Sequence, residues 1–180
     1  MLLFDMGLPM IIPTGFLMVV TLVPIVFIEA HIVGTALQLD FKKVLAPVTI
    51  ANLVSTLIGI PVTWFLLALL EIGSVIILGT IEKRIVSADL FALTLGAPWV
   101  YPGHDNENLI ILGAMLFLLI PYGLASWAIE YYVVKIILAK KQSVRSSPDQ
   151  IKFAVSKANL ISYCILAILA ILLPIFFGSN

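Results

Sequence analysis

The chain has 180 residues, of which 62 % are hydrophobic and 11 % are charged, and its formal net charge is +0. A soluble domain is roughly half apolar and about a quarter charged, so this composition excludes an ordinary soluble protein and indicates a single integral membrane domain over residues 1–180. The charge balance gives no basic excess for a nucleic-acid partner. The single cysteine, Cys164, excludes an intramolecular disulfide and a cysteine metal cluster.

Four apolar stretches are long enough to span a bilayer, which takes about 20 helical residues. They run from about residue 8 to 39, from 47 to 70 with an apolar continuation to 81, from 109 to 138, and from 153 to 173. The residues before the first stretch lack the basic segment of a secretory signal, so we expect a retained helix. Pro24 predicts a kink in this helix, and Pro174 predicts the end of the fourth. The expected fold is all-α, a polytopic membrane protein with four transmembrane helices.

The link between the second and third stretches, residues 82–108, is long for a compact bundle, and such loops usually carry function. Its semi-apolar part, residues 85–95, predicts a short interfacial helix, followed by a turn in which Trp99 and Tyr101 suit the membrane interface. A membrane anchor is favoured over a ligand lid. The acidic groups around His104 form either a divalent-ion site on the outer face or, as we favour, a solvated turn.

Lysine and arginine predict the orientation of the chain. Eight of the ten basic residues flank the first and third links, and the positive-inside rule makes that side cytoplasmic. These residues are Lys42, Lys43, Lys135, Lys140, Lys141, Arg145, Lys152 and Lys157. Both termini and the 82–108 loop are then expected to be external or lumenal. The basic run 140–157 is a candidate contact for anionic lipid or an acidic partner, although ordinary positive-inside charge is the stronger explanation.

A short pattern occurs twice and predicts an internal repeat of about residues 8–81 and 109–177. Ile28-Glu29 is followed by Ala51-Asn52-Leu53-Val54-Ser55, and Ile129-Glu130 is followed by Ala158-Asn159-Leu160-Ile161-Ser162. Val and Leu follow each glutamate at identical offsets, at Val33 and Leu37 and at Val134 and Leu138. Each copy forms a helical hairpin with the same out-in-out topology, so we expect a four-helix bundle with a pseudo-twofold axis along the membrane normal.

The two glutamates are the main candidates for a functional role, because carboxylates inside a membrane are costly. Glu29 and Asn52 lie at similar distances from their turn, as do Glu130 and Asn159, so each Glu is predicted to meet its Asn across the hairpin. The favoured interpretation is interhelical hydrogen bonding that fixes the register of each hairpin. A proton or cation site built from both pairs, or carboxylates that reach the cytoplasmic interface, are the alternatives.

Two further features of the helices carry weaker hypotheses. A stripe on the second helix is better explained by close packing than by a pore lining. It consists of Asn52, Ser55, Thr56, Gly59 and Thr63. His31 lies two residues after Glu29 and points elsewhere; a lone membrane histidine is a weak candidate ligand for chlorophyll or haem, and it could equally hydrogen-bond to a neighbouring helix. Apart from chlorophyll, haem or a contact with lipid, no cofactor is expected.

Enzymatic signatures are missing from the sequence. It contains no metalloprotease, nucleophile-elbow, phosphate-loop or dinucleotide motif. A di-iron bundle site needs a histidine three residues after the glutamate, and neither Glu29 nor Glu130 has one. We therefore expect a protein without enzymatic activity and without a bound metal.

The segments Ile28-Glu29-Ala30 and Ala51 to Gly59 resemble those of small uncharacterised four-helix membrane proteins found in cyanobacteria and other bacteria. The resemblance covers about a quarter of the chain and implies a membrane location, either plasma membrane or thylakoid, with no established activity. The leading hypothesis is an accessory or assembly subunit of a larger membrane complex, either photosynthetic or respiratory. The alternative is a small oligomeric ion- or proton-coupled transporter or channel that uses Glu29 and Glu130.

Overall fold

The computed structural model describes residues 8–9, 11–78, 99–100, 107–140 and 146–177. Apart from one pair of two-residue strands, the regular structure in these ranges is helical. Four stretches are long and apolar enough to cross a membrane, namely Gly15–Leu37, Phe41–Leu69, Ile111–Lys140 and Pro148–Leu172. The prediction of a helical chain with four spans of membrane length is confirmed.

The helices follow one another as two antiparallel pairs. The first pair consists of α1 (Ile11–Leu37) and a long helix built from α2 (Phe41–Val54), the π-helical segment η1 (Ser55–Gly59) and α3 (Ile60–Leu78). The second pair consists of α5 (Glu107–Lys140) and α6 (Pro148–Phe177). Strand β1 (Leu8–Pro9) pairs antiparallel with β2 (Trp99–Val100), so Trp99 lies in a short ladder just before the start of α1, while the rest of the turn expected around it lies outside the described residues.

The second span begins six residues earlier than predicted, because the chain reverses within a very short turn. Gln38 adopts a left-handed conformation with φ 55°. The Leu39 N–H donates to the Gly34 carbonyl and the Gln38 N–H to the Thr35 carbonyl, which is the Schellman pattern of a helix end. A Cβ on Gly34 would lie 3.2 Å from the Leu39 carbonyl oxygen, so glycine permits this close return.

Helix α6 extends beyond the predicted range of 153 to 173 at both ends. Ser147 and Gln150 form a capping box: the Ser147 hydroxyl accepts from the Gln150 N–H, and the Gln150 side chain accepts from the Ser147 N–H. Pro148 occupies the first helical position, where its missing N–H costs nothing. The prediction that Pro174 ends the helix is wrong, since α6 continues to Phe177.

The prolines within the spans are accommodated in different ways. Pro24, Pro47 and Pro121 lie inside continuous helices. Pro61 lacks the N–H that would bond to the Leu57 carbonyl, and the wider π-helical turn η1 lies immediately before it. This π-helical segment begins at Ser55 and ends two residues before Pro61.

The buried side chains form two apolar layers. The layer nearer the α1–α2 turn contains Val33, Val48, Val134 and Val155 together with fully buried alanines on α1, α2 and α6. The other layer is centred on Leu118, Tyr122 and Leu166. Glu29, Asn52, Glu130 and Asn159 are all buried, and each lies along its helix between residues of one layer and residues of the other. A thin polar layer therefore separates two apolar ones.

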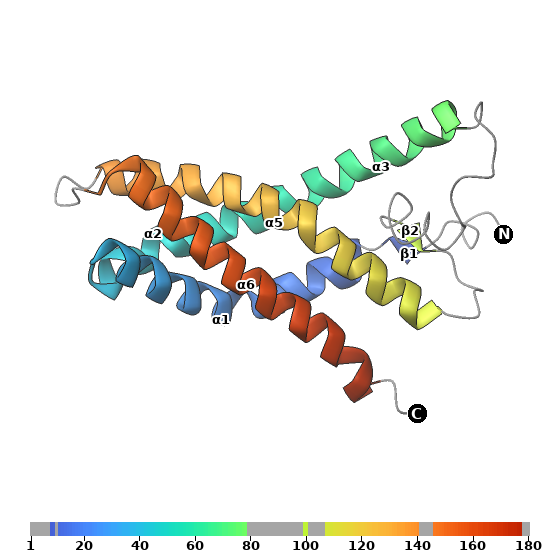
Figure 1. The fold of residues 1–180 in the computed structure, drawn as a ribbon, viewed down its shortest axis with the longest axis horizontal. Helices are drawn as coiled ribbons and strands as arrows, with labels where there is room; N and C mark the ends of the chain where they lie inside the picture. The colour runs from blue at the N-terminus through green and yellow to red at the C-terminus, as the bar shows by residue number, and fades with distance from the viewer. Residues whose placement is uncertain (1–7, 10, 79–98, 101–106, 141–145, 178–180) are drawn as a thin grey trace.

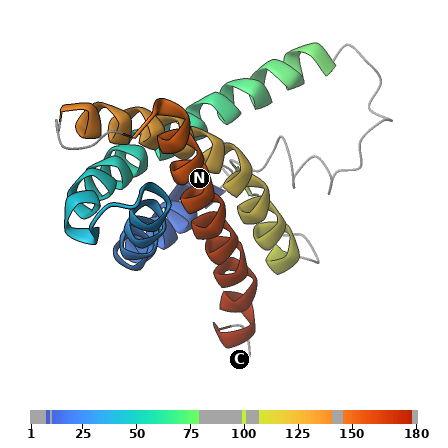
Figure 2. The ribbon, with the colours of Figure 1, turned by 60° about the vertical axis from the view of Figure 1, so that its left-hand side comes forward.

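The α1–α2 turn and the ends of α5 and α6 that face each other lie together at one end of the molecule (Figure 1). Towards the other end the helices spread, and α3 diverges furthest from the rest (Figure 2). Lys42, Lys43, Lys140 and Lys152 all lie on helix termini at the compact end. These four of the basic residues that set the predicted orientation are therefore gathered at one end.

Several predictions lie outside the described residues. These are the interfacial helix over residues 85–95, the place of Tyr101, His104 and Asp105, and the basic residues Lys141 and Arg145. Of the acidic group predicted near His104, only Glu107 is described, as the first residue of α5.

Candidate functional site

The polar layer contains two glutamates, two asparagines and three serines, which we call the carboxyl cluster. Its members are Glu29, Asn52, Ser55, Ser126, Glu130, Asn159 and Ser162. Glu29 is 2 % exposed and Glu130 is 3 % exposed, so neither carboxyl group reaches the surface of the protein. The cluster therefore lies in surroundings where unsatisfied polar groups are costly.

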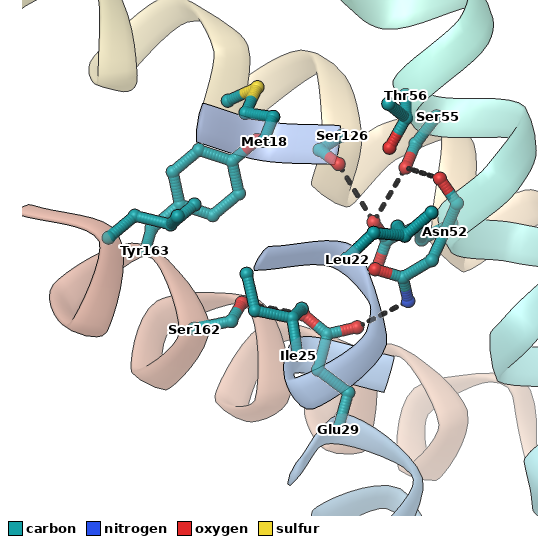
Figure 3. Close-up of a pocket in the computed structure, with 12 residues that line it drawn as sticks. Met18, Leu22, Ile25, Glu29, Asn52, Ser55, Thr56, Ser126, Ser162 and Tyr163 are labelled. Carbon is teal, nitrogen blue, oxygen red and sulfur yellow. Dashed lines mark hydrogen bonds between the residues drawn. The ribbon is translucent and has the colours of Figure 1, made fainter. Parts of the chain in front are cut away.

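Glu29 on α1 accepts hydrogen bonds from two other helices. The Asn52 Nδ2 lies 2.6 Å from its Oε2, and the Ser162 Oγ lies 2.5 Å from its Oε1. Figure 3 shows Asn52 and Ser162 approaching the carboxyl group from opposite sides. The contact with Asn52 is the one that the spacing around the turn predicts, whereas Ser162 comes from α6 in the other half of the chain.

Glu130 on α5 has a matching set of partners with one addition. The Asn159 Nδ2 lies 2.6 Å from its Oε2, and the Ser55 Oγ lies 2.8 Å from its Oε1. The hydroxyl of Ser126, one helical turn before Glu130, lies 2.7 Å from the same oxygen. Ile25 precedes Glu29 at the same offset, so the third partner exists only at Glu130.

The partners of the two glutamates are exchanged between the halves of the chain. Each Glu bonds to the Asn of its own half and to the Ser of the other half. The cluster therefore bonds α1 to α2 and to α6, and bonds α5 to α6 and to the start of η1. A side-chain network that spans all four helices fixes their relative positions in a way that apolar contacts alone do not.

The asparagine and serine side chains also bond to their own helices. The Asn52 Nδ2 lies 3.1 Å from the Val48 carbonyl oxygen. The Ser55 Oγ lies 3.1 Å from the Asn52 carbonyl, and the Ser162 Oγ lies 3.0 Å from the Asn159 carbonyl. These bonds orient the three side chains, so the donors are held in place before they meet the carboxyl groups.

A cavity of about 30 Å³ adjoins the cluster. Its lining includes both glutamates, and it extends past Thr56 and Tyr163 to Met18 and Leu22 (Figure 3). A cavity needs roughly 10–15 Å³ of such volume and several polar partners to hold one water molecule. The site therefore has room for water, but not for a substrate of several heavy atoms.

Sequence reasoning placed the Glu and Asn side chains but missed how serine connects them. Ser55 and Ser162 each follow an Asn by three residues, and this offset puts them on the same helical face as the Asn. That repeated spacing was the available signal for Ser55 and Ser162. Ser126 stands four residues before Glu130, but the first copy has no equivalent to draw attention to it.

The other candidate residues do not join the cluster. His31 is exposed on α1 and lines a separate hollow of about 360 Å³ beside the α1–α2 turn. In the stripe on the second span, Asn52, Ser55, Gly59 and Thr63 are buried and Thr56 is half-buried, as close packing requires. Within the described part of the chain, no group of three or more His, Cys, Asp or Glu side chains could hold a metal ion.

Comparisons with protein families, with curated proteins and with solved structures give no match.

Proposed function

We propose that the chain is a non-enzymatic integral membrane protein that serves as an accessory or assembly subunit of a larger membrane complex. The carboxyl cluster holds its four spans together, and its lysine-rich end faces the cytoplasm. If the cyanobacterial resemblance holds, the complex is photosynthetic or respiratory and the membrane is the thylakoid or the plasma membrane. The opposite, spread end of the bundle then lies at the external or lumenal side.

The observation that carries this proposal is the position of α3. Helix α3 diverges from the other spans (Figures 1 and 2), and over residues 60–69, where its side chains are described, Ile60, Thr63 and Leu67 are buried against them. In the same range, the exposed large apolar side chains are Val62, Phe65, Leu66 and Leu69. Helices in membranes gain stability by packing closely against other helices, so a partner helix would complete the packing of α3.

Purification from native membranes in mild detergent tests this proposal. The tagged protein should retain a partner at fixed stoichiometry, and Phe65→Ala together with Leu66→Ala should reduce that stoichiometry. Phe153→Ala is the matched control, because Phe153 is an equally apolar, exposed residue on α6. A chain that purifies alone from its native membrane, or a partner lost equally in the control, would contradict the subunit proposal.

The internal repeat supports the arrangement of the spans. Equivalent residues of the two copies, such as Val33 and Val134 or Ala51 and Ala158, are buried alike, and the two glutamates have matching partners. We propose that the α1–α2 and α5–α6 pairs are repeated hairpins related by an axis near the membrane normal.

A proton- or cation-coupled transporter is the second candidate function. The observation that favours it is the cavity beside both glutamates, because buried carboxyl groups next to water mark proton and ion pathways in many membrane proteins. A transporter should move protons or sodium in liposomes that contain this chain alone. Flux that Glu29→Gln eliminates would favour this candidate over the subunit.

A further inference from the structure

The carboxyl cluster holds fewer hydrogen atoms than its contacts require. Besides the contact between the two carboxyl groups, eight close contacts join its polar atoms to one another and to backbone carbonyls. The amide of Asn52 supplies hydrogens for two of them and that of Asn159 for one. Each serine hydroxyl has a single hydrogen, so the three serines fill three more contacts. Two contacts are left without a hydrogen.

The missing hydrogens belong to two specific places. Ser55 contacts both Glu130 and the Asn52 carbonyl, and Ser162 contacts both Glu29 and the Asn159 carbonyl. All four of these partners are acceptors unless the glutamates carry hydrogen. If each serine donates to its helix carbonyl, a hydrogen on each carboxyl group can point to the serine oxygen. Each of the eight contacts then has one hydrogen.

The surroundings of the cluster lead to the same conclusion. In the described part of the chain, the polar partners of each glutamate are asparagine and serine groups and the other glutamate, with no lysine or histidine among them. The other titratable groups nearby are the hydroxyls of Tyr122 and Tyr163, on α5 and α6. Two carboxylate charges side by side between apolar layers would be costly without a cation.

We propose that Glu29 and Glu130 each bind a proton in this fold, so that the cluster is a two-proton site whose occupancy keeps the two halves of the bundle together. This inference rests on the proposed function, in which the carboxyl cluster holds the four spans together. Loss of both protons would leave two adjacent anions, and it would turn the contacts with Ser55 and Ser162 into competition for hydrogens that the helix carbonyls already use. The two bound protons therefore supply the hydrogen bonds from Glu29 to Ser162 and from Glu130 to Ser55 that join the halves.

Infrared spectroscopy of the full chain in phosphatidylcholine and phosphatidylglycerol vesicles at neutral pH tests this inference. The C=O stretching band of protonated carboxyl groups should be present and should shift when glutamate is labelled with ¹³C. Glu29→Gln and Glu130→Gln should each remove one contribution, and the double variant should remove both. Asp149→Asn, an exposed acid at the start of α6, should leave the band unchanged.

Glutamine copies a protonated glutamate, with a donor NH2 and an acceptor oxygen, so these variants should fold, which circular dichroism checks. The labelled wild-type chain provides a reading that needs no variant. Absence of a glutamate-derived band at neutral pH, or a band that the double variant retains, would overturn the two-proton site. A different result would contradict only the proposed role of the carboxyl cluster in holding the spans together. In that case the glutamine variants lose the band, but Glu29→Leu and Glu130→Leu are as stable as wild type.

Discussion

The glutamates show how a membrane bundle accommodates polar side chains at its centre. Each carboxyl group lies between apolar layers, yet both of its oxygens have hydrogen-bonding partners. A hydrogen bond between membrane helices contributes on average only about 0.6 kcal/mol. The cost of leaving a buried partner unsatisfied is larger, roughly 1–3 kcal/mol, so the cluster acts mainly by penalising arrangements in which its members do not meet.

This asymmetry predicts different outcomes for two replacements of Glu29. Glu29→Gln should retain bonds to Asn52 and Ser162 and change the unfolding free energy little. Glu29→Leu should destabilise the protein by roughly 1–3 kcal/mol, because it leaves buried polar groups without partners. Detergent-induced unfolding followed by circular dichroism measures both. Equal stability of the two variants would show that the hydrogen bonds of Glu29 contribute nothing.

Gly123 allows α5 and α6 to approach closely beside the cluster. A Cβ added there would lie 3.1 Å from Tyr163 Cδ1 and 3.3 Å from two other ring atoms, so the ring would have to move. We predict that Gly123→Ala lowers stability by about 1–3 kcal/mol, the usual cost of overpacking. Thermal unfolding in detergent measures the loss.

Gly73→Ala is the matched control for this substitution, because an added Cβ there meets nothing within 4 Å. It should leave the melting temperature unchanged or raise it. If both alanine variants have the same melting temperature, the close approach of Tyr163 to Gly123 does not constrain the packing.

The contacts within each half were predictable from the sequence, but those between the halves were not. Glu29 and Asn52 are equally distant from a short turn, and antiparallel helices bring such residues to the same depth. Nothing in that spacing says which side chains meet across the bundle. The bonds from Ser162 to Glu29 and from Ser55 to Glu130 depend on how α6 and η1 pack against the other half, which is a property of the whole fold.

At the scale of single elements, local polar signals set helix ends that hydropathy cannot locate. The apolar pattern of the fourth span starts near residue 153, yet the capping box of Ser147 and Gln150 begins the helix at Pro148. The second span similarly begins at Phe41, directly after the Schellman turn at Gln38. The polar first turns of both helices lie outside the apolar pattern, so hydropathy alone placed these starts five or six residues too late.

The capping box predicts that the first turn of α6 depends on Ser147. Ser147→Ala removes the acceptor for the Gln150 N–H, and such changes typically cost about 0.5–2 kcal/mol. Hydrogen exchange at Gln150 and Ile151 should therefore become faster. Ser146→Ala, one residue outside the box, should not change it. Equal exchange rates in both variants would mean that the cap does not hold this turn.

At the scale of the whole molecule, the compact end carries the lysines that predict its side of the membrane. Lys42 and Lys43 lie at the start of the second span. Lys140 is the last residue of α5, and Lys152 lies near the start of α6. With Cys164 replaced by serine, Ser146→Cys should react with a membrane-impermeant thiol reagent only after the cells are opened. Labelling in intact cells would place the lysine-rich end outside and overturn the orientation.

The exchange of serine partners between the two halves of the bundle is the central feature of the carboxyl cluster. Solid-state NMR of the chain in lipid, with ¹³C-labelled glutamate and serine, observes this exchange directly. The strongest correlations should join Glu29 Cδ to Ser162 Cβ and Glu130 Cδ to the Cβ atoms of Ser55 and Ser126, and Ser162→Ala should remove only the first. Strongest correlations of Glu29 with Ser55, or none between glutamate and serine, would contradict the carboxyl cluster that holds the two halves together.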